Sequence, residues 1–105
     1  MTTALVYSAE TVSEYDDLEA ARDADGTTWV HLAEPDASTV DRVAELFDLH
    51  PLAIEDIRND VRPKTEEFER YTFVLLKTAT LRRGETTFEE EIRDEPVGLF
   101  IGDDW

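Results

Sequence analysis

The chain has 105 residues, no cysteine, and 26 acidic against 10 basic side chains, which gives a formal net charge of −16 at pH 7. This length suits one domain. The lack of cysteine excludes disulfides, thiolate catalysis and cysteine-ligated zinc, and it favours a reducing compartment. So negative a chain is unsuited to nucleic acids, because proteins hold phosphates with basic side chains, and it is repelled by anionic lipid surfaces.

The acidic residues have two competing explanations. They could form a surface that attracts cations, or they could be an adaptation to very high salt, where screening removes the repulsion between like charges. We favour the second, because the acids are scattered along the chain and lysine occurs only as Lys64 and Lys77. Neither a signal peptide nor an apolar run near the roughly 20 residues of a spanning helix is visible. We therefore expect a soluble, cytoplasmic and halophilic chain.

The first part of the chain predicts two short strands separated by a helix. Residues 4–7 (ALVY) form an apolar run typical of a strand. Ser13 opens a segment that resembles a helix-capping box, so we expect a helix from there to the stop signal at Gly26. Residues 28–32 (TWVHL) predict the second strand, and Trp29 is among its large apolar members.

Two helices are expected next. Asp36 suits the N-cap of the first, because its carboxylate can accept hydrogen bonds from unpaired backbone amides. Pro51 cannot continue that helix but suits the first turn of another, so the two helices should meet near residue 50. The apolar stripe of the first helix is Val40, Val43, Ala44 and Phe47. The apolar face of the second is Ile54, Ile57 and Val61.

The last third predicts strands. Residues 71–81 are β-branched or aromatic at both alternating positions, which is typical of a central strand covered on both faces. A turn at 83–84 precedes an expected edge strand at 86–92, whose three consecutive glutamates would protect it from pairing. Residues 96–101 predict a further strand. Trp105 stands alone after a turn, an odd end for a domain, and indicates that the chain is part of a longer protein.

This order of elements predicts the fold class. A β, α, β, α, α succession followed by a β-meander indicates an α/β domain with a mixed, partly antiparallel central sheet and helices packed on its faces. No internal repeat or low-complexity segment divides the chain, so residues 1–105 are expected to form a single domain.

The most informative acids are Glu55 and Asp56. If their helix buries Ile54 and Ile57, both acids lie roughly 130° from the buried side, on opposite flanks of the solvent face. Asp60 follows Asp56 by four residues, a spacing at which like charges on a helix repel mildly and a divalent cation would relieve the repulsion. Exposed carboxylates suit a largely hydrated Mg²⁺. The alternative, that these acids are only a solvated helix surface, stays open.

No catalytic group stands out, so the chain is not expected to be an enzyme. His31 lies in a predicted strand and His50 precedes a helix that it should cap; neither has a partner at the spacing of a zinc site or a catalytic dyad. Both a nucleophile elbow and a glycine-rich phosphate loop are missing from the sequence. Lys64 is expected to pair locally with Glu66 or Glu67.

Several short segments stand in a specific order and spacing. The most specific are HPLAIED at residues 50–56 and RPK at residues 62–64. Further segments are WVHL at 29–32 followed by Pro35, YTFVLL at 71–76, and EPVGLFIG at 95–102. Together they resemble the cytoplasmic domain of CorA-type magnesium transporters, from about Leu5 to Trp105.

The resemblance implies a function. It implies a cytoplasmic, N-terminal regulatory domain with an α/β/α sandwich fold, hung from the plasma membrane in a homopentameric channel for Mg²⁺ and, in some members, Co²⁺ or Ni²⁺. The acid matching Asp56 would face an acid on a neighbouring subunit's stalk helix, where Mg²⁺ holds the pore shut. The acid matching Glu55 would belong to a second, neighbouring metal site. No organic cofactor is implied.

The chain also departs from the family pattern. The stalk, the two membrane helices and the Gly-Met-Asn pore motif are absent, so this fragment would not conduct ions and would carry only half of each metal site. His31 stands where the family commonly has an acidic or amide residue, and we assign it no role. Two alternatives stay open: a zinc-transporting relative, and a free-standing acidic protein-interaction module around Asp56 and Asp60.

Overall fold

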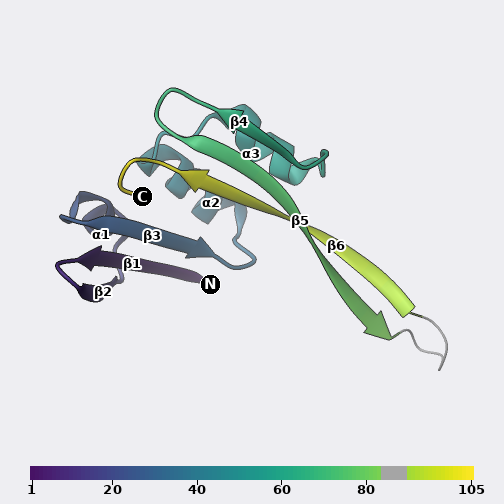
Figure 1. Cartoon of the computed structure of the whole chain (residues 1–105), viewed down its shortest axis with the longest axis horizontal. Helices are drawn as coiled ribbons and strands as arrows, with labels where there is room; N and C mark the ends of the chain where they lie inside the picture. Colours follow the sequence, from purple (N-terminus) through teal and green to yellow (C-terminus); the bar gives the residue numbers. More distant parts are fainter. Residues whose placement is uncertain (84–89) are drawn as a thin grey trace. The chain divides into compact units, whose positions relative to one another are not determined.

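The computed structural model describes the backbone of residues 1–83 and 90–105, and the side chains of residues 1–81 and 94–105 (Figure 1). It divides into two compact units, Met1–Ile54 with Gly102–Trp105, and Glu55–Ile101. The expected mixture of strands and helices is confirmed. The elements are β1 (Thr2–Ser8), β2 (Thr11–Tyr15), α1 (Leu18–Asp23), β3 (Thr27–Leu32), α2 (Ala37–Leu46), α3 (Pro51–Arg58), β4 (Lys64–Glu67), β5 (Thr72–Arg83) and β6 (Glu90–Ile101).

The first unit is built on a three-stranded antiparallel sheet in the order β2-β1-β3. β1 and β2 form a hairpin whose two turn residues, Ala9 and Glu10, both have positive φ (50° and 69°), the backbone form that matches the twist of paired strands. The prediction of a helix starting at Ser13 is therefore wrong, because Ser13 pairs with Val6 inside this sheet. Pairing with a strand outweighed the local capping signal.

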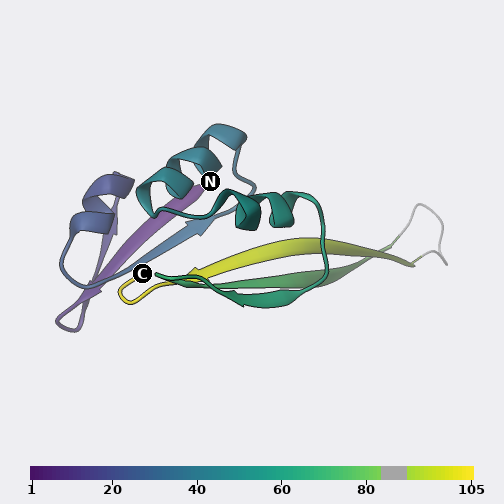
Figure 2. The same ribbon diagram turned by 90° about the horizontal axis from the view of Figure 1, so that it is seen from above.

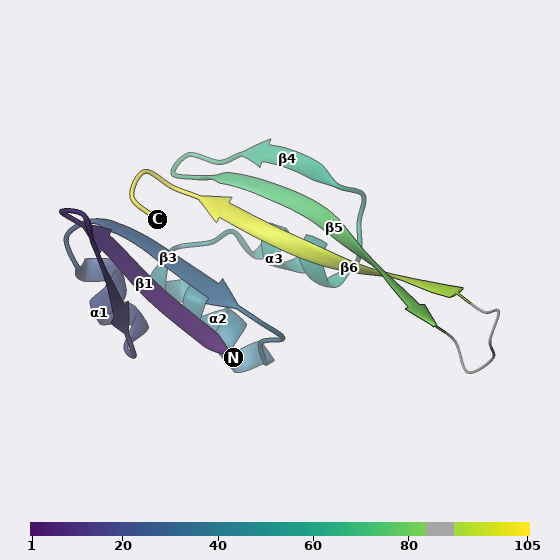
Figure 3. The same ribbon diagram turned by 60° about the horizontal axis from the view of Figure 1, so that its bottom comes forward.

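Helix α1 lies on one face of this sheet (Figure 3). It begins after Asp17, whose carboxylate accepts a hydrogen bond from the backbone N–H of Glu19. Its Ala21 is fully buried against Ala4 and Val6 of β1. The buried Thr28 hydroxyl of β3 donates to the carbonyl of Ala21 at 2.9 Å, which satisfies a polar group that would otherwise be costly to bury.

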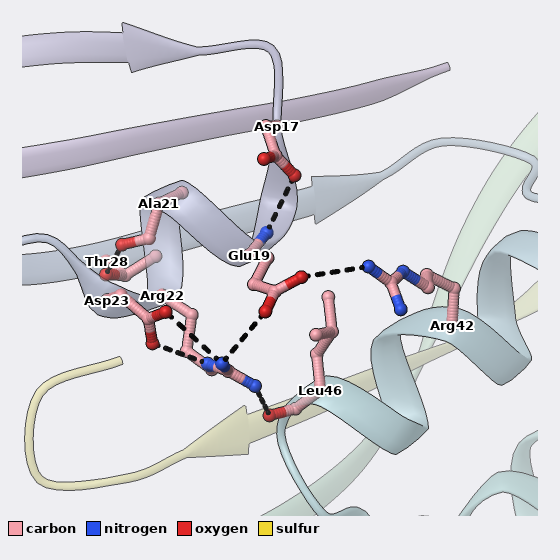
Figure 4. A network of polar contacts seen from close by, with 8 residues as sticks. All are labelled: Asp17, Glu19, Ala21, Arg22, Asp23, Thr28, Arg42 and Leu46. Atoms are coloured by element: carbon pink, nitrogen blue, oxygen red, sulfur yellow. Dashed lines mark hydrogen bonds and ion pairs between the residues drawn. The ribbon is translucent and has the colours of Figure 1, made fainter.

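Polar contacts join α1 to α2 (Figure 4). The Arg22 guanidinium donates to the carbonyl of Leu46 at 3.2 Å, one of the carbonyls left unpaired at the end of α2. Arg42 lies 3.4 Å from the carboxylate of Glu19. Arg22 also pairs with Asp23 at 2.9 Å, and this pair lowers the pKa of Asp23 below its ordinary value.

The start of α2 confirms the predicted cap. The carboxylate of Asp36 accepts hydrogen bonds from the Thr39 backbone N–H at 2.8 Å and from the Ser38 hydroxyl at 3.0 Å. Val43 and Phe47 of the predicted stripe are buried. The ring of Phe47 lies 5.1 Å from that of Trp105, so this tryptophan, which follows the last strand without a return strand, packs against the end of α2.

The Asp36 cap makes stability depend on pH. Hydrogen bonds from Thr39, and then Ser38, lower the pKa of Asp36 below its ordinary value. The cap therefore stabilises the fold fully above the unfolded pKa of about 3.9, and this contribution is lost as the pH falls through the folded pKa. We expect wild type to lose stability relative to Asp36→Asn as the pH falls from about 5 through the lowered folded pKa, because asparagine caps equally well without titrating. Thermal unfolding of both proteins, followed by circular dichroism at each pH, would measure their difference in stability. A difference that does not change with pH would contradict the prediction.

The second unit contains the antiparallel sheet β4-β5-β6, with β5 in the centre as predicted. Phe73 and Leu75 of β5 are the most deeply buried large side chains described, and the Phe73 ring stacks on Phe100 of β6 at 4.9 Å. Helix α3 covers this face (Figure 2). Its Ile57 side chain lies so close to Gly98 of β6 that a Cβ at Gly98 would collide with it. On the opposite face Leu76 is exposed, so the predicted coverage of this strand on both faces is not seen there.

The sheets differ from the expectation of one mixed central sheet. Every strand pairing in the described residues is antiparallel and the strands form two sheets. The α/β/α sandwich stays a prediction. β2 and β4 are strands that the sequence analysis did not predict. The predicted turn at 83–84 and edge strand at 86–92 fall mostly outside the described residues, although 90–92 belong to β6.

A candidate cation site at helix α3

Helix α3 starts as the sequence predicts. Pro51 occupies its first turn, where its missing N–H is not needed. The Nδ1 atom of His50 accepts a hydrogen bond from the Leu52 backbone N–H at 3.1 Å, which confirms His50 as a cap. Ala53 is buried, and Asp56 and Ile57 are partly buried, whereas Glu55 is exposed. The two candidate acids therefore differ in environment: Glu55 faces solvent, and Asp56 lies closer to the body of the unit than the helical periodicity indicated.

Asp56 forms an ion pair with a lysine of the same chain. Its Oδ2 atom lies 2.5 Å from the Nζ atom of Lys64, the first residue of β4. The same ammonium pairs with Glu66, as predicted from their closeness in sequence. Hydrogen bonds to Asp56, and then to Glu66, raise the pKa of Lys64 above its ordinary value, so the ammonium stays charged at neutral pH.

Asp60 does not share a helix face with Asp56. α3 ends at Arg58, and Asp60 follows in a turn with a φ of 52°, a conformation that aspartate and asparagine tolerate better than most residues. Its carboxylate lies 3.1 Å from the Nζ atom of Lys77 on β5. The predicted repulsion along one helix face is therefore wrong, and both lysines of the chain pair with acids of the segment 56–60.

The described residues do not complete a metal centre by themselves. Among the side chains described, those of residues 1–81 and 94–105, no group of three or more potential ligands lies close enough together to hold a metal ion. His31 is exposed on β3, opposite Thr3 of β1. What α3 offers is one exposed and one partly buried carboxylate. Mg²⁺ commonly uses such a set, because it keeps several waters and takes one or two carboxylates.

Comparison with known proteins places this chain in a family. Residues 24–104 match the family described as CorA-like Mg2+ transporter protein, a match that includes α3 and β4. The chain belongs to this family. It is a family of transporters and not of enzymes. Across the part of the chain that the structure describes, no helix is long and apolar enough to cross a membrane.

Curated relatives agree with this assignment. The chain is 38% identical over 102 residues to the Cobalt/magnesium transport protein CorA of Thermotoga maritima, covering 90% of this chain and 28% of that protein. It is 33% identical over 84 residues to each of the magnesium transporters ALR2 and ALR1 of Saccharomyces cerevisiae, covering 79% of this chain and 9% of each relative. The chain thus spans less than a third of the length of the curated relatives that it matches.

Proposed function

We propose that this chain is the cytoplasmic N-terminal domain of a CorA-type transporter of Mg²⁺, and that it senses the ion that the complete protein transports. One observation carries the proposal: within the segment matching the family, the partly buried carboxylate of Asp56 already binds a cation, the ammonium of Lys64. The name of the Thermotoga relative supports magnesium and cobalt as the transported ions.

In this proposal residues 1–105 act as one domain, with the helices and sheets arranged as an α/β/α sandwich. The complete protein is a homopentamer in the plasma membrane, with this domain at its cytoplasmic face. Asp56 supplies half of a regulatory Mg²⁺ site and Glu55 half of a neighbouring one. The remaining ligands are acids of an adjacent subunit.

The proposed mechanism is a population shift. A hydrated Mg²⁺ held between Asp56 and a neighbouring subunit stabilises the closed, symmetric assembly, and its loss releases the subunits. The ion shifts the equilibrium only because it binds the closed arrangement more tightly than the open one. The isolated chain, which has half of each site, should bind Mg²⁺ weakly. Because the matched family is one of transporters, we prefer this function to a free-standing acidic interaction module.

Asp56→Asn in the complete protein tests the proposal. We expect the Mg²⁺ concentration that half-protects the closed assembly from proteolysis to rise about tenfold, a coupling typical of regulatory sites. Asp60→Asn is the matched control, because it removes the same charge from another lysine-paired acid. The Mg²⁺ concentration that half-protects Asp60→Asn should differ from that of wild type by less than about twofold. An unchanged midpoint for Asp56→Asn would remove this residue from the sensor, and a tighter response to Zn²⁺ than to Mg²⁺ would favour the zinc-transporting relative.

A further inference from the structure

The contacts of Lys64 suggest a role beyond holding β4 in place. Its ammonium lies between two carboxylates on different elements, Asp56 of α3 and Glu66 of β4. The side chains of Lys64 and Asp56 are only 33% and 26% exposed. Lys64 is held in register by its pairing with the buried Leu75 of β5. The sheet and the helix therefore both position this ion pair, which makes it more persistent than a typical surface pair.

The choice of lysine matters in this chain. Arginine supplies most of the basic side chains, and only Lys64 and Lys77 carry a side-chain ammonium. A guanidinium would hold a carboxylate through two parallel hydrogen bonds, whereas an ammonium is a compact charge on a flexible stem that can leave one oxygen and keep another. Lys64 has such a second acceptor in Glu66.

We propose that Lys64 is a built-in competitor of the divalent cation at Asp56. This inference rests on the proposed sensing function of Asp56. Without the ion, the ammonium neutralises the partly buried carboxylate, which would otherwise be left unpaired. When Mg²⁺ binds, the ammonium leaves Asp56 and stays with Glu66, and its positive charge next to the ion weakens binding. Lys64 thereby raises the Mg²⁺ concentration at which the sensor responds.

Two substitutions of Lys64 should move the response of the complete protein in opposite directions. Lys64→Met removes the competing charge, so the Mg²⁺ midpoint for protection from proteolysis should fall about fivefold, the upper end of what a partly exposed ion pair contributes, because the ion no longer has to displace an ammonium from Asp56. Lys64→Arg keeps the charge and holds Asp56 with a fork of donors, so its midpoint should rise about twofold or more. A purely structural lysine would not give opposite shifts.

Lys77→Met is the matched control. It changes the net charge by the same amount and breaks the other lysine pair, that with Asp60, so its midpoint should change less than about twofold. The double variant Asp56→Asn/Lys64→Met completes a cycle, in which Lys64→Met should have a smaller effect once Asp56 is neutral, because only the repulsion between the ammonium and the ion is left.

The outcomes separate this inference from the proposed function. If Asp56→Asn leaves the midpoint unchanged, the sensing function itself fails. If Asp56→Asn shifts it and Lys64→Met does not, or if Lys64→Met acts equally in both backgrounds, the competitor role alone is overturned. Should Lys64→Met fail to assemble, the charge-conserving Lys64→Arg decides: a raised midpoint supports competition, and an unchanged or lowered one refutes it.

Discussion

Phe73→Ala is expected to lower the free energy of unfolding by about 3–5 kcal/mol, the usual cost of removing a fully buried phenylalanine. Phe73 is 0% exposed and its ring stacks on Phe100 at 4.9 Å. It also pairs with Glu66 across the β4–β5 ladder, so the cavity would form beside the strand that carries Lys64 and Glu66. Urea unfolding followed by circular dichroism would measure the loss.

Leu76→Ala is the matched control for that prediction. Leu76 lies on the same strand but on the opposite face and is 44% exposed, so less apolar area returns to water and no closed cavity forms. We expect it to cost less than about 1.5 kcal/mol. Equal costs for the two variants would mean that the face bearing Phe73 is not the core of the second unit.

Gly26→Ala is expected to cost about 3 kcal/mol or more, because two unfavourable terms add. Gly26 has a φ of 126°, a conformation that residues with a Cβ rarely adopt. A Cβ there would also overlap the carbonyl oxygen of Tyr7, a backbone atom of the central strand β1 that cannot move without disturbing its ladder. Thermal unfolding of the variant would report the loss.

Gly98→Ala separates these two terms. The added Cβ would meet the Cδ1 atom of Ile57, the movable end of a side chain, and Gly98 does not have positive φ. We expect this substitution to lower the free energy of unfolding by about 1–2 kcal/mol, since Ile57 must change rotamer or shift. If Gly26→Ala proved milder than Gly98→Ala, backbone strain at Gly26 could not be the reason for its glycine.

Local signals predicted the middle of the chain well. The Asp36 cap, the Val43 and Phe47 stripe, and the start of α3 at Pro51 all depend on residues within a few positions of one another. The pairing of Lys64 with Glu66 was predicted for the same reason. Local reasoning failed at Ser13, where a capping pattern competed with β1, a strand that only the hairpin brings alongside.

In the candidate site, too, local sequence predicted some features and missed others. Glu55 and Asp56 could be selected from a short motif on one helix, but their unequal burial could not, because it depends on what packs against α3. The pairs Asp56–Lys64 and Asp60–Lys77 were also missed. They form because α3 ends at Arg58 and the following turn lets β4 and β5 return to the helix.

The sequence by itself determined the α/β class, the two central helices, the central strand and the membership in the CorA-like family, because these depend on periodicity, caps and short ordered motifs. Only the tertiary structure decided that the strands form two antiparallel sheets, that Trp29 faces outward opposite Leu5 at 61% exposure, and that Asp56 holds an ammonium. Each of these depends on contacts between segments distant in sequence, whose energies no local pattern encodes.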